Sequence, residues 1–253
     1  MNILCFLYAA CGAALDFLFP ERCALCGSFI LPGRRAGRYP LCRVCADGLP
    51  SPRTPRCLVC SRPLISEKDL CMDCRRPGQG GANGFSFECN VSVFMYQDPG
   101  IMELIISYKG RKRRSLAVFL ASRLLAEYRL RWNGLPVVPV PCRAASLKKR
   151  GFDQIALLCR EMKRRGGVRI LPLLKRSGKT REQKTLNRKE RVRNLAGSVY
   201  PARRSRRYLK NGVPERLVLL DDIFTTGATT SACARVLKEL GVKEVYVLTL
   251  ALD

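Results

Sequence analysis

Histidine is absent from this chain of 253 residues, and acidic residues are scarce. Without histidine, a metal must be held by thiolates or carboxylates, and no reaction can use a histidine base. The 20 Asp and Glu residues face 46 Lys and Arg residues, which leaves a formal net charge of +26. Such an excess of cations indicates a polyanionic partner such as nucleic acid, or else a generally basic, solvated surface.

Long apolar runs are also lacking, except at the N-terminus, where residues 1–15 carry no charge. This run is shorter than the ~18 residues that a membrane span needs, and no Lys or Arg precedes it as in a secretory signal. Its apolar residues recur at helical spacing, so we expect a helix over residues 1–19 that packs on the protein itself. The sequence shows no other targeting or transmembrane segment, so the expected location is the cytoplasm.

Cysteine, by contrast, is abundant, with 14 residues. Eight of them form four C-x-x-C pairs within residues 20–80, a region rich in Pro, Gly and Arg that cannot bury a conventional core. The pairs are Cys23/Cys26, Cys42/Cys45, Cys57/Cys60 and Cys71/Cys74. Two residues between cysteines let both thiolates of one turn reach a single metal, and zinc takes four such ligands at tetrahedral corners. We therefore predict two structural zinc ions in a double zinc ribbon.

The spacing leaves the pairing of these cysteines open. The simplest arrangement is sequential, with the first four on one zinc and the last four on the other, and the spacing also leaves an interleaved arrangement open. A disulfide framework would need an oxidising compartment, which no secretion signal supports, and a redox motif does not account for four pairs. We expect the second ribbon to unfold without its zinc while leaving the rest of the chain largely intact.

Residues 81–253 alternate between strand and helix patterns. Strands are expected within 85–94 and over 137–140, 217–220 and 245–250, and helices over 101–108, 116–132, 151–165 and 229–240. Residues 175–194 are polar and very basic, which favours a long loop. The alternation implies an α/β fold, with a parallel sheet flanked by helices and ligands at the carboxyl ends of its strands.

The most specific pattern is LVLLDDIFTTGAT at residues 217–229, which predicts a buried strand, two carboxylates, a small-residue turn and a helix. Free N–H groups and hydroxyls at a helix N-terminus bind an anion, and adjacent carboxylates suit sugar hydroxyls. Together they fit a ribose 5-phosphate, and the alternative is an ordinary turn whose acids cap the helix. The pattern resembles the phosphoribosyl-pyrophosphate (PRPP) motif of type I phosphoribosyltransferases. That resemblance implies that Asp221 and Asp222 bind the ribose hydroxyls, and that the 5-phosphate is bound by Thr225, Thr226, Gly227, Ala228 and Thr229.

Further segments, in their order along the chain, are similar to those of one family. They are Phe19-Pro20 before the first Cys pair, Tyr108-Lys109-Gly110, Val138-Pro139-Val140-Pro141, Arg150-Gly151-Phe152-Asp153-Gln154, and then Thr180, Gln183, Leu186, Arg191, Asn194 and Gly197. This order resembles ComF proteins, in which a double zinc ribbon precedes a domain with the type I phosphoribosyltransferase fold. Three residues depart from the family pattern: Arg143 replaces a common His, Asp153 a usual Asn, and Phe224 a smaller aliphatic residue.

The resemblance implies a PRPP-binding protein that handles single-stranded DNA during natural transformation, with proteins of the DNA-uptake machinery as further partners. Basic clusters at 109–114, 148–150, 160–165, 175–193 and 203–210 are the predicted DNA contacts. The alternative is an active phosphoribosyltransferase that transfers ribose 5-phosphate from PRPP to an acceptor and releases pyrophosphate, with Mg²⁺ bound alongside PRPP. Lys109 is the candidate pyrophosphate contact, unless it is one more solvated cation of a basic run.

Overall fold

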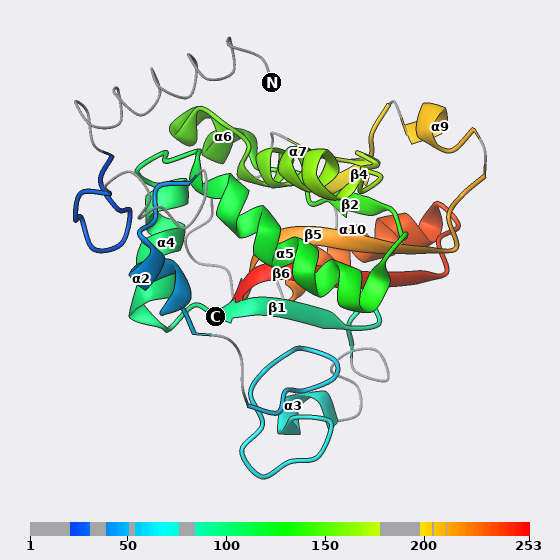
Figure 1. Cartoon of the computed structure of the whole chain (residues 1–253). Coiled ribbons are helices and arrows are strands. Elements are labelled where there is room, and N and C mark those ends of the chain that lie inside the picture. Colours follow the sequence, from blue (N-terminus) through cyan, green and yellow to red (C-terminus); the bar gives the residue numbers. More distant parts are fainter. Residues whose placement is uncertain are drawn as a thin grey trace, which may run out of the picture. The chain divides into compact units, whose positions relative to one another are not determined.

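The computed structural model describes seven stretches of the chain: residues 21–30, 39–50, 54–75, 84–177, 198–203, 205–210 and 212–253. The helix expected over residues 1–19 and most of the basic loop at 175–194 lie outside them. The fold comprises two units (Figure 1). The first unit is Met1–Pro50 with Gln97–Phe119, and the second unit is Ser51–Tyr96 with Leu120–Asp253. Each unit therefore contains one pair of C-x-x-C motifs and a later part of the chain.

In the first unit, helix α4 (Pro99–Lys109) has an apolar face that is buried. It begins at Asp98, whose carboxylate accepts a hydrogen bond from the Ile101 amide at 3.0 Å, and Pro99 takes the first helical position. Ile101, Leu104 and Tyr108 are fully buried on one face. The expected helix over 101–108 is confirmed, and it packs with the cysteine-containing segment described below.

The second unit is built on a four-stranded sheet with the order β1-β6-β5-β2, in which all neighbours are parallel. The strands are β1 (Asn90–Met95), β2 (Val137–Pro139), β5 (Arg216–Phe224) and β6 (Glu244–Leu252). The two central strands are covered on both faces, which is why Leu217–Leu220 and much of β6 read as unbroken apolar runs. The predicted α/β class with a parallel sheet is confirmed.

Helices cover both faces of this sheet. The connection from β1 to β2 and the connection from β5 to β6 cross the sheet in opposite directions. Right-handed crossovers therefore place α5 (Leu116–Trp132) and α10 (Ala228–Glu239) on opposite faces, as Figure 1 shows. Helix α7 (Gln154–Gly166) lies beside α5. The contact includes a hydrogen bond of 3.4 Å from the Arg129 side chain of α5 to the Arg165 carbonyl of α7.

Several elements differ from the sequence prediction. Strand β1 begins at Asn90, and Phe85 and Phe87 lie before it. Helix α6 (Ala144–Arg150) was not predicted, because it buries no side chain and so carries no apolar periodicity. Four short elements outside the main sheet were also missed or lie at the edge of the expected loop: α3 (Met72–Arg75), β3 (Leu174–Arg176), β4 (Val199–Pro201) and α9 (Ser205–Tyr208). Strands β3 and β4 pair antiparallel with each other.

A search of the described residues finds no helix with the length and apolarity required of a membrane span.

Candidate functional site

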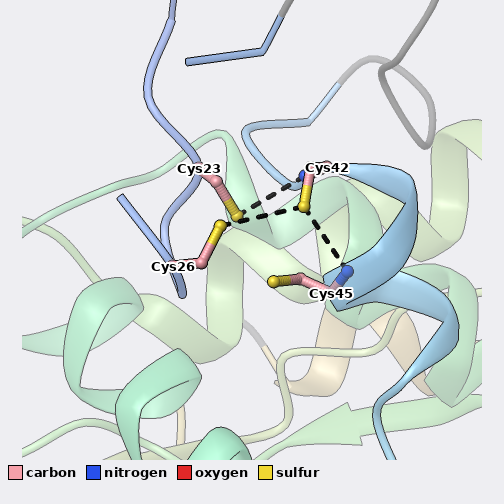
Figure 2. A group of neighbouring side chains, drawn as sticks. All are labelled: Cys23, Cys26, Cys42 and Cys45. Carbon is pink, nitrogen blue, oxygen red and sulfur yellow. Dashed lines mark hydrogen bonds between the residues drawn. The ribbon is translucent and has the colours of Figure 1, made fainter. Parts of the chain in front are cut away.

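Four cysteine side chains of the first unit converge on one point (Figure 2). Cys23 and Cys26 come from a turn, and Cys42 and Cys45 from the start of helix α2 (Arg43–Asp47). Their sulfur atoms all lie within 4.8 Å of one another. The Cys42 thiol caps α2 by accepting from the Cys45 amide at 3.4 Å, and the Cys42 amide donates to the Cys23 sulfur at 3.5 Å. The helix start thus fixes two ligands, and its amide groups offset negative charge on the sulfurs.

A second set of four cysteines occupies the second unit. Cys57, Cys60, Cys71 and Cys74 also place their sulfurs within 4.8 Å of one another, and all four are buried. In the first set, Cys23 is buried while Cys26 is exposed. The structure therefore groups the eight cysteines sequentially, and it excludes the interleaved pairing that the spacing had left open.

The two cysteine turns repeat the same backbone geometry. The Gly27 amide donates to the Cys23 carbonyl at 3.1 Å, and the Ser61 amide donates to the Cys57 carbonyl at 2.9 Å. Both donors have a left-handed backbone, with φ of 71° and 68°. A short antiparallel bridge closes each turn, between residues 22 and 29 in one and between 56 and 63 in the other. The ribbons are therefore internal repeats.

Crowded thiols alter one another's pKa within each set. The pKa of Cys57 is lowered to about 4, mainly by a hydrogen bond from the Cys60 thiol, and that bond together with burial raises the pKa of Cys60. Burial also raises the pKa of Cys74 to about 12. Within each set, a thiolate at one cysteine thus disfavours a thiolate at its neighbour. A divalent cation removes this effect, because it stabilises the thiolate form of every ligand. Each set offers four soft donors in tetrahedral reach, which fits a structural zinc ion.

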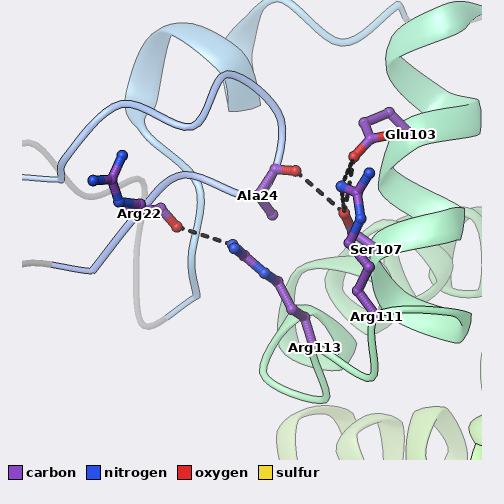
Figure 3. Close-up of polar contacts among 6 residues, drawn as sticks. All are labelled: Arg22, Ala24, Glu103, Ser107, Arg111 and Arg113. Atoms are coloured by element: carbon purple, nitrogen blue, oxygen red, sulfur yellow. Dashed lines mark hydrogen bonds and ion pairs between the residues drawn. The ribbon is translucent and has the colours of Figure 1, made fainter.

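The first ribbon is attached to α4 and the loop after it by side-chain hydrogen bonds to its backbone (Figure 3). The Ser107 hydroxyl donates to the Ala24 carbonyl at 3.3 Å, and Arg113 donates to the Arg22 carbonyl at 3.0 Å. Arg111 pairs with Glu103 and donates to Ser107 at 3.3 Å. Two residues of the basic cluster 109–114 therefore have structural partners within the first unit.

The second ribbon pairs along β1, an edge strand of the sheet. The Asn90 amide donates to the Val59 carbonyl at 2.7 Å, and its side chain donates to the Cys60 carbonyl at 3.2 Å. Arg56 donates to the Ser92 carbonyl at 2.6 Å. These bonds cover the open edge of the sheet. The four cysteines of this ribbon also belong to one hydrophobic cluster with residues of β2, β5, α10 and β6.

The predicted PRPP loop forms a continuous strand–turn–helix unit. Strand β5 carries Asp221 and Asp222 three and two residues before its end at Phe224, and both acids are partly exposed. Exposed Thr225 and Thr226 form the turn, and Gly227 begins α10 with φ of 72°. The order of carboxylates, turn and helix N-terminus follows the sequence prediction, although the strand runs past the acids and does not end at them.

Asp222 has a partner that the sequence did not reveal. Gln154, the first residue of α7, donates to its carboxylate at 2.8 Å, and Arg150 donates in turn to the Gln154 side-chain oxygen. The second carboxylate oxygen of Asp222 accepts from the Ile223 amide at 2.7 Å. These contacts fix the orientation of the carboxylate. The sequence signal for this contact is the segment 150–154, which predicts no structural role for Gln154 by itself.

The acids lie at the point where the topology of the sheet reverses. Adjacent strands β2 and β5 are followed by helices on opposite faces, α7 on one and α10 on the other. A crevice opens between the carboxyl ends of two such strands, and ligands of open α/β sheets bind there. Arg143 follows β2 at this edge and is the N-cap residue that precedes α6. Asp153 caps α7 by accepting from the Ile155 and Ala156 amides.

Phe224 is buried at the end of β5 against Phe85 and Phe87, with ring centroids 6.0 and 5.9 Å away. A Cβ atom at Gly227 would lie 2.5 Å from the Phe85 ring and 2.8 Å from the Phe224 ring. The turn is therefore held from beneath by an aromatic cluster, which accounts for the aromatic residue at 224. Lys109 ends α4 in the first unit, whereas Asp221 lies in the second, so its predicted pyrophosphate contact stays a prediction.

Comparisons with known proteins bear on the cysteine ribbons and on the chain as a whole. A family model described as a double zinc ribbon domain matches residues 14–75. The protein is thus of the class in which a double zinc ribbon adjoins an α/β domain. It is 30% identical over 233 residues to the DNA utilization protein YhgH of Salmonella typhi, which covers 82% of this chain and 94% of that protein.

Two competence proteins are also similar. The Streptococcus pneumoniae competence protein ComFC is 28% identical over 212 residues, covering 83% of this chain and 86% of that one. The competence protein F of Haemophilus influenzae is 33% identical over 117 residues, about half of each chain. A hypoxanthine phosphoribosyltransferase from Staphylococcus aureus superposes with a TM-score of 0.34 at 15% identity over 55% of this chain and 65% of that one. The similarity to YhgH and to the two competence proteins, together with the double zinc ribbon, shows that the chain belongs to the ComF family.

Proposed function

We propose that this protein binds PRPP at the β5–turn–α10 unit and handles single-stranded DNA in DNA uptake, in the cytoplasm. The observation that carries the proposal is the position of Asp221 and Asp222, at the reversal point of the sheet and directly before a helix N-terminus. Carboxylates repel phosphate, so their presence beside an anion site favours a ligand with hydroxyl groups next to its phosphate. A phosphorylated ribose has that arrangement.

Each part of the unit has a chemical task in this proposal. Asp221 and Asp222 accept hydrogen bonds from the ribose hydroxyls, and Gln154 holds Asp222 in place. The backbone and hydroxyls of residues 225–229 bind the 5-phosphate, helped by the positive end of the α10 dipole. Glycine at 227 permits the left-handed turn that brings these amides together.

Exposed cations support the DNA part of the proposal. On α6 and α7 they include Lys148, Lys149, Arg160 and Lys163, and neutralisation of phosphates by such residues gives binding without sequence preference. Relatives of 28–33% identity carry the names competence protein and DNA utilization protein. Proteins of the DNA-uptake machinery are the further partners that this proposal expects.

Replacing both acids tests the PRPP site. In Asp221→Ala/Asp222→Ala, PRPP affinity measured by calorimetry should fall by about 2–4 kcal/mol, because two charge-assisted hydrogen-bonding groups are lost. Inorganic phosphate should bind equally well or better, since the repulsion is gone. The control is Glu88→Ala/Glu215→Ala, which removes two exposed, ion-paired acids of the same unit. PRPP binding by the double Asp variant at the parent's affinity would refute the site.

A second function is favoured by Arg176, whose guanidinium is partly buried, with Nε and Nη2 out of contact with solvent, and whose positive charge is favoured by Asp221. In an active phosphoribosyltransferase, a cation there would stabilise the departing pyrophosphate together with Mg²⁺. Pyrophosphate release that depends on an added acceptor would establish transfer. Salt-dependent binding of single-stranded DNA without pyrophosphate release would leave binding as the function.

A further inference from the structure

Arg176 ends β3, opposite Val199 of β4, in the second unit. Its Nε and one terminal nitrogen, Nη2, are buried. Within the described part of the chain, neither of these nitrogens has a hydrogen-bond acceptor. A guanidinium is always charged and presents its donors in a rigid fork. Burying two of those donors without an acceptor is costly, so a buried guanidinium is normally matched by an anion.

Among the described residues, the surroundings of Arg176 do not supply that match at Nε and Nη2. Burial lowers the pKa of Arg176, and the positive charge of Arg143 acts in the same direction. The Cys233 thiol, Asp221 and the Cys142 thiol, in decreasing order, act in favour of the cation, and Asp221 is the carboxylate among these three groups. Burial and a second arginine thus both disfavour the charge of Arg176, and Asp221 does not accept a hydrogen bond from the buried Nε or Nη2.

These neighbours locate the site. Cys142 and Arg143 follow β2, Asp221 lies on β5, and Cys233 lies on α10. The guanidinium is thus at the reversal point between β2 and β5, on the same strand ends as the proposed ribose acids. The turn after Asp221 already provides one anion site, so a cation next to Asp221 in space calls for a second anionic group on the same ligand.

We propose that Arg176, assisted by Arg143, binds the diphosphate group of the phosphorylated sugar held at Asp221 and Asp222. This assignment rests on the proposed function and adds to it the residue that distinguishes PRPP from ribose 5-phosphate. A planar fork of donors matches two oxygens of a phosphate, which a lysine at the same place would not do. Buried nitrogens are poorly placed for a DNA backbone at the surface, which favours a small ligand.

The test compares Arg176→Met with Arg169→Met, which removes an exposed arginine of the same unit. Calorimetry with inorganic pyrophosphate, PRPP and ribose 5-phosphate, each with Mg²⁺, gives the three affinities. In Arg176→Met, pyrophosphate and PRPP should bind at least tenfold more weakly, and ribose 5-phosphate should change less than twofold. Arg169→Met should leave all three within twofold. Equal losses for PRPP and ribose 5-phosphate, or unchanged pyrophosphate binding, would overturn the assignment.

Thermal unfolding without ligand separates ligand binding from a structural contact. Removing a buried cation that lacks an acceptor should leave the midpoint of Arg176→Met equal to or above that of the parent. A lower midpoint would mean that the chain itself supplies the acceptor, and the assignment would be wrong. If the parent binds pyrophosphate but not PRPP, and Arg176→Met loses pyrophosphate, the PRPP proposal fails while the diphosphate site stands. A parent that binds no pyrophosphate overturns the site itself.

Discussion

At the scale of single residues, Gly227 is limited by two separate constraints. Its φ of 72° is costly for any residue with a Cβ, and a Cβ there would collide with Phe85 and Phe224. Gly167 has a similar φ of 65° but has no atom within 4 Å of the corresponding Cβ position. Alanine substitutions at Gly227 and Gly167 therefore separate the energetic cost of backbone strain from that of steric overlap.

Gly227→Ala should lower the free energy of unfolding by about 2–5 kcal/mol, as the sum of left-handed strain and overpacking. Gly167→Ala should cost only the strain, about 1–2 kcal/mol. Urea unfolding can be followed by the fluorescence of Trp132, the single tryptophan, which stacks on Tyr246 in the second unit. Equal losses in the two variants would show that the aromatic cluster yields without cost.

The sequence predicted residues whose chemistry is encoded locally. The acids, the turn and the paired cysteines are each recognisable within a few positions. Gln154 and Arg176 were missed because their relevant neighbours are distant in sequence: Gln154 binds Asp222, 68 residues later. The alternation of Phe85 with Phe87 predicts strand residues, whereas both side chains pack under the turn.

At the scale of elements, the two cysteine sets differ in exposure. Cys26 is exposed and two more ligands of the first set are half-buried, whereas all four of the second set are buried. A chelator should therefore remove zinc in two phases of about one ion each, because solvent reaches the first site more readily. A colorimetric zinc indicator measures the release. Cys26→Ser should abolish the fast phase and Cys60→Ser the slow one, and a single phase in the parent would contradict the difference in access.

The second ribbon is more than an attached module, which revises the expectation from the sequence. Its cysteines share a hydrophobic cluster with the sheet, and its backbone pairs with β1. Cys57→Ser/Cys60→Ser should therefore lower the thermal midpoint reported by Trp132, since loss of the metal exposes part of that cluster. Cys23→Ser/Cys26→Ser should change this midpoint less. The opposite order would restore the view that the second ribbon folds independently.

Most regular elements could be predicted because they carry a buried apolar face. The helix expected over 116–132 is observed as α5 with the same bounds, and the last two strands were found but are longer than expected. Helix α6 and the short β3–β4 pair were missed, since neither offers a repeated apolar pattern. The pairing of ribbon with sheet could not be predicted, because it depends on backbone hydrogen bonds between segments.

At the scale of the whole molecule, the net charge of +26 makes a prediction about salt. The logarithm of the association constant for single-stranded DNA should fall linearly with log salt, by about 0.7 per neutralised phosphate. Lys148→Ala/Lys149→Ala should reduce the slope by about 1.4. The control variant Lys238→Ala/Lys243→Ala loses the same two positive charges. These two lysines are paired with Glu88 and Glu215, so the salt slope of the control should change less. A flat salt response would reject electrostatic binding.

The pairing of β1 with β6 also bears on how the chain folds during synthesis. Asn90 pairs with Val247, so β1 waits for its partner until well over half of the chain has followed it from the ribosome. Such non-local parallel pairing is slow and leaves a strand edge open in the meantime. The second ribbon precedes β1 in sequence and bonds to it through Val59, Cys60 and Arg56. A nascent chain that has captured zinc would thus shield β1 early, and a zinc-starved cell should accumulate this protein as aggregate.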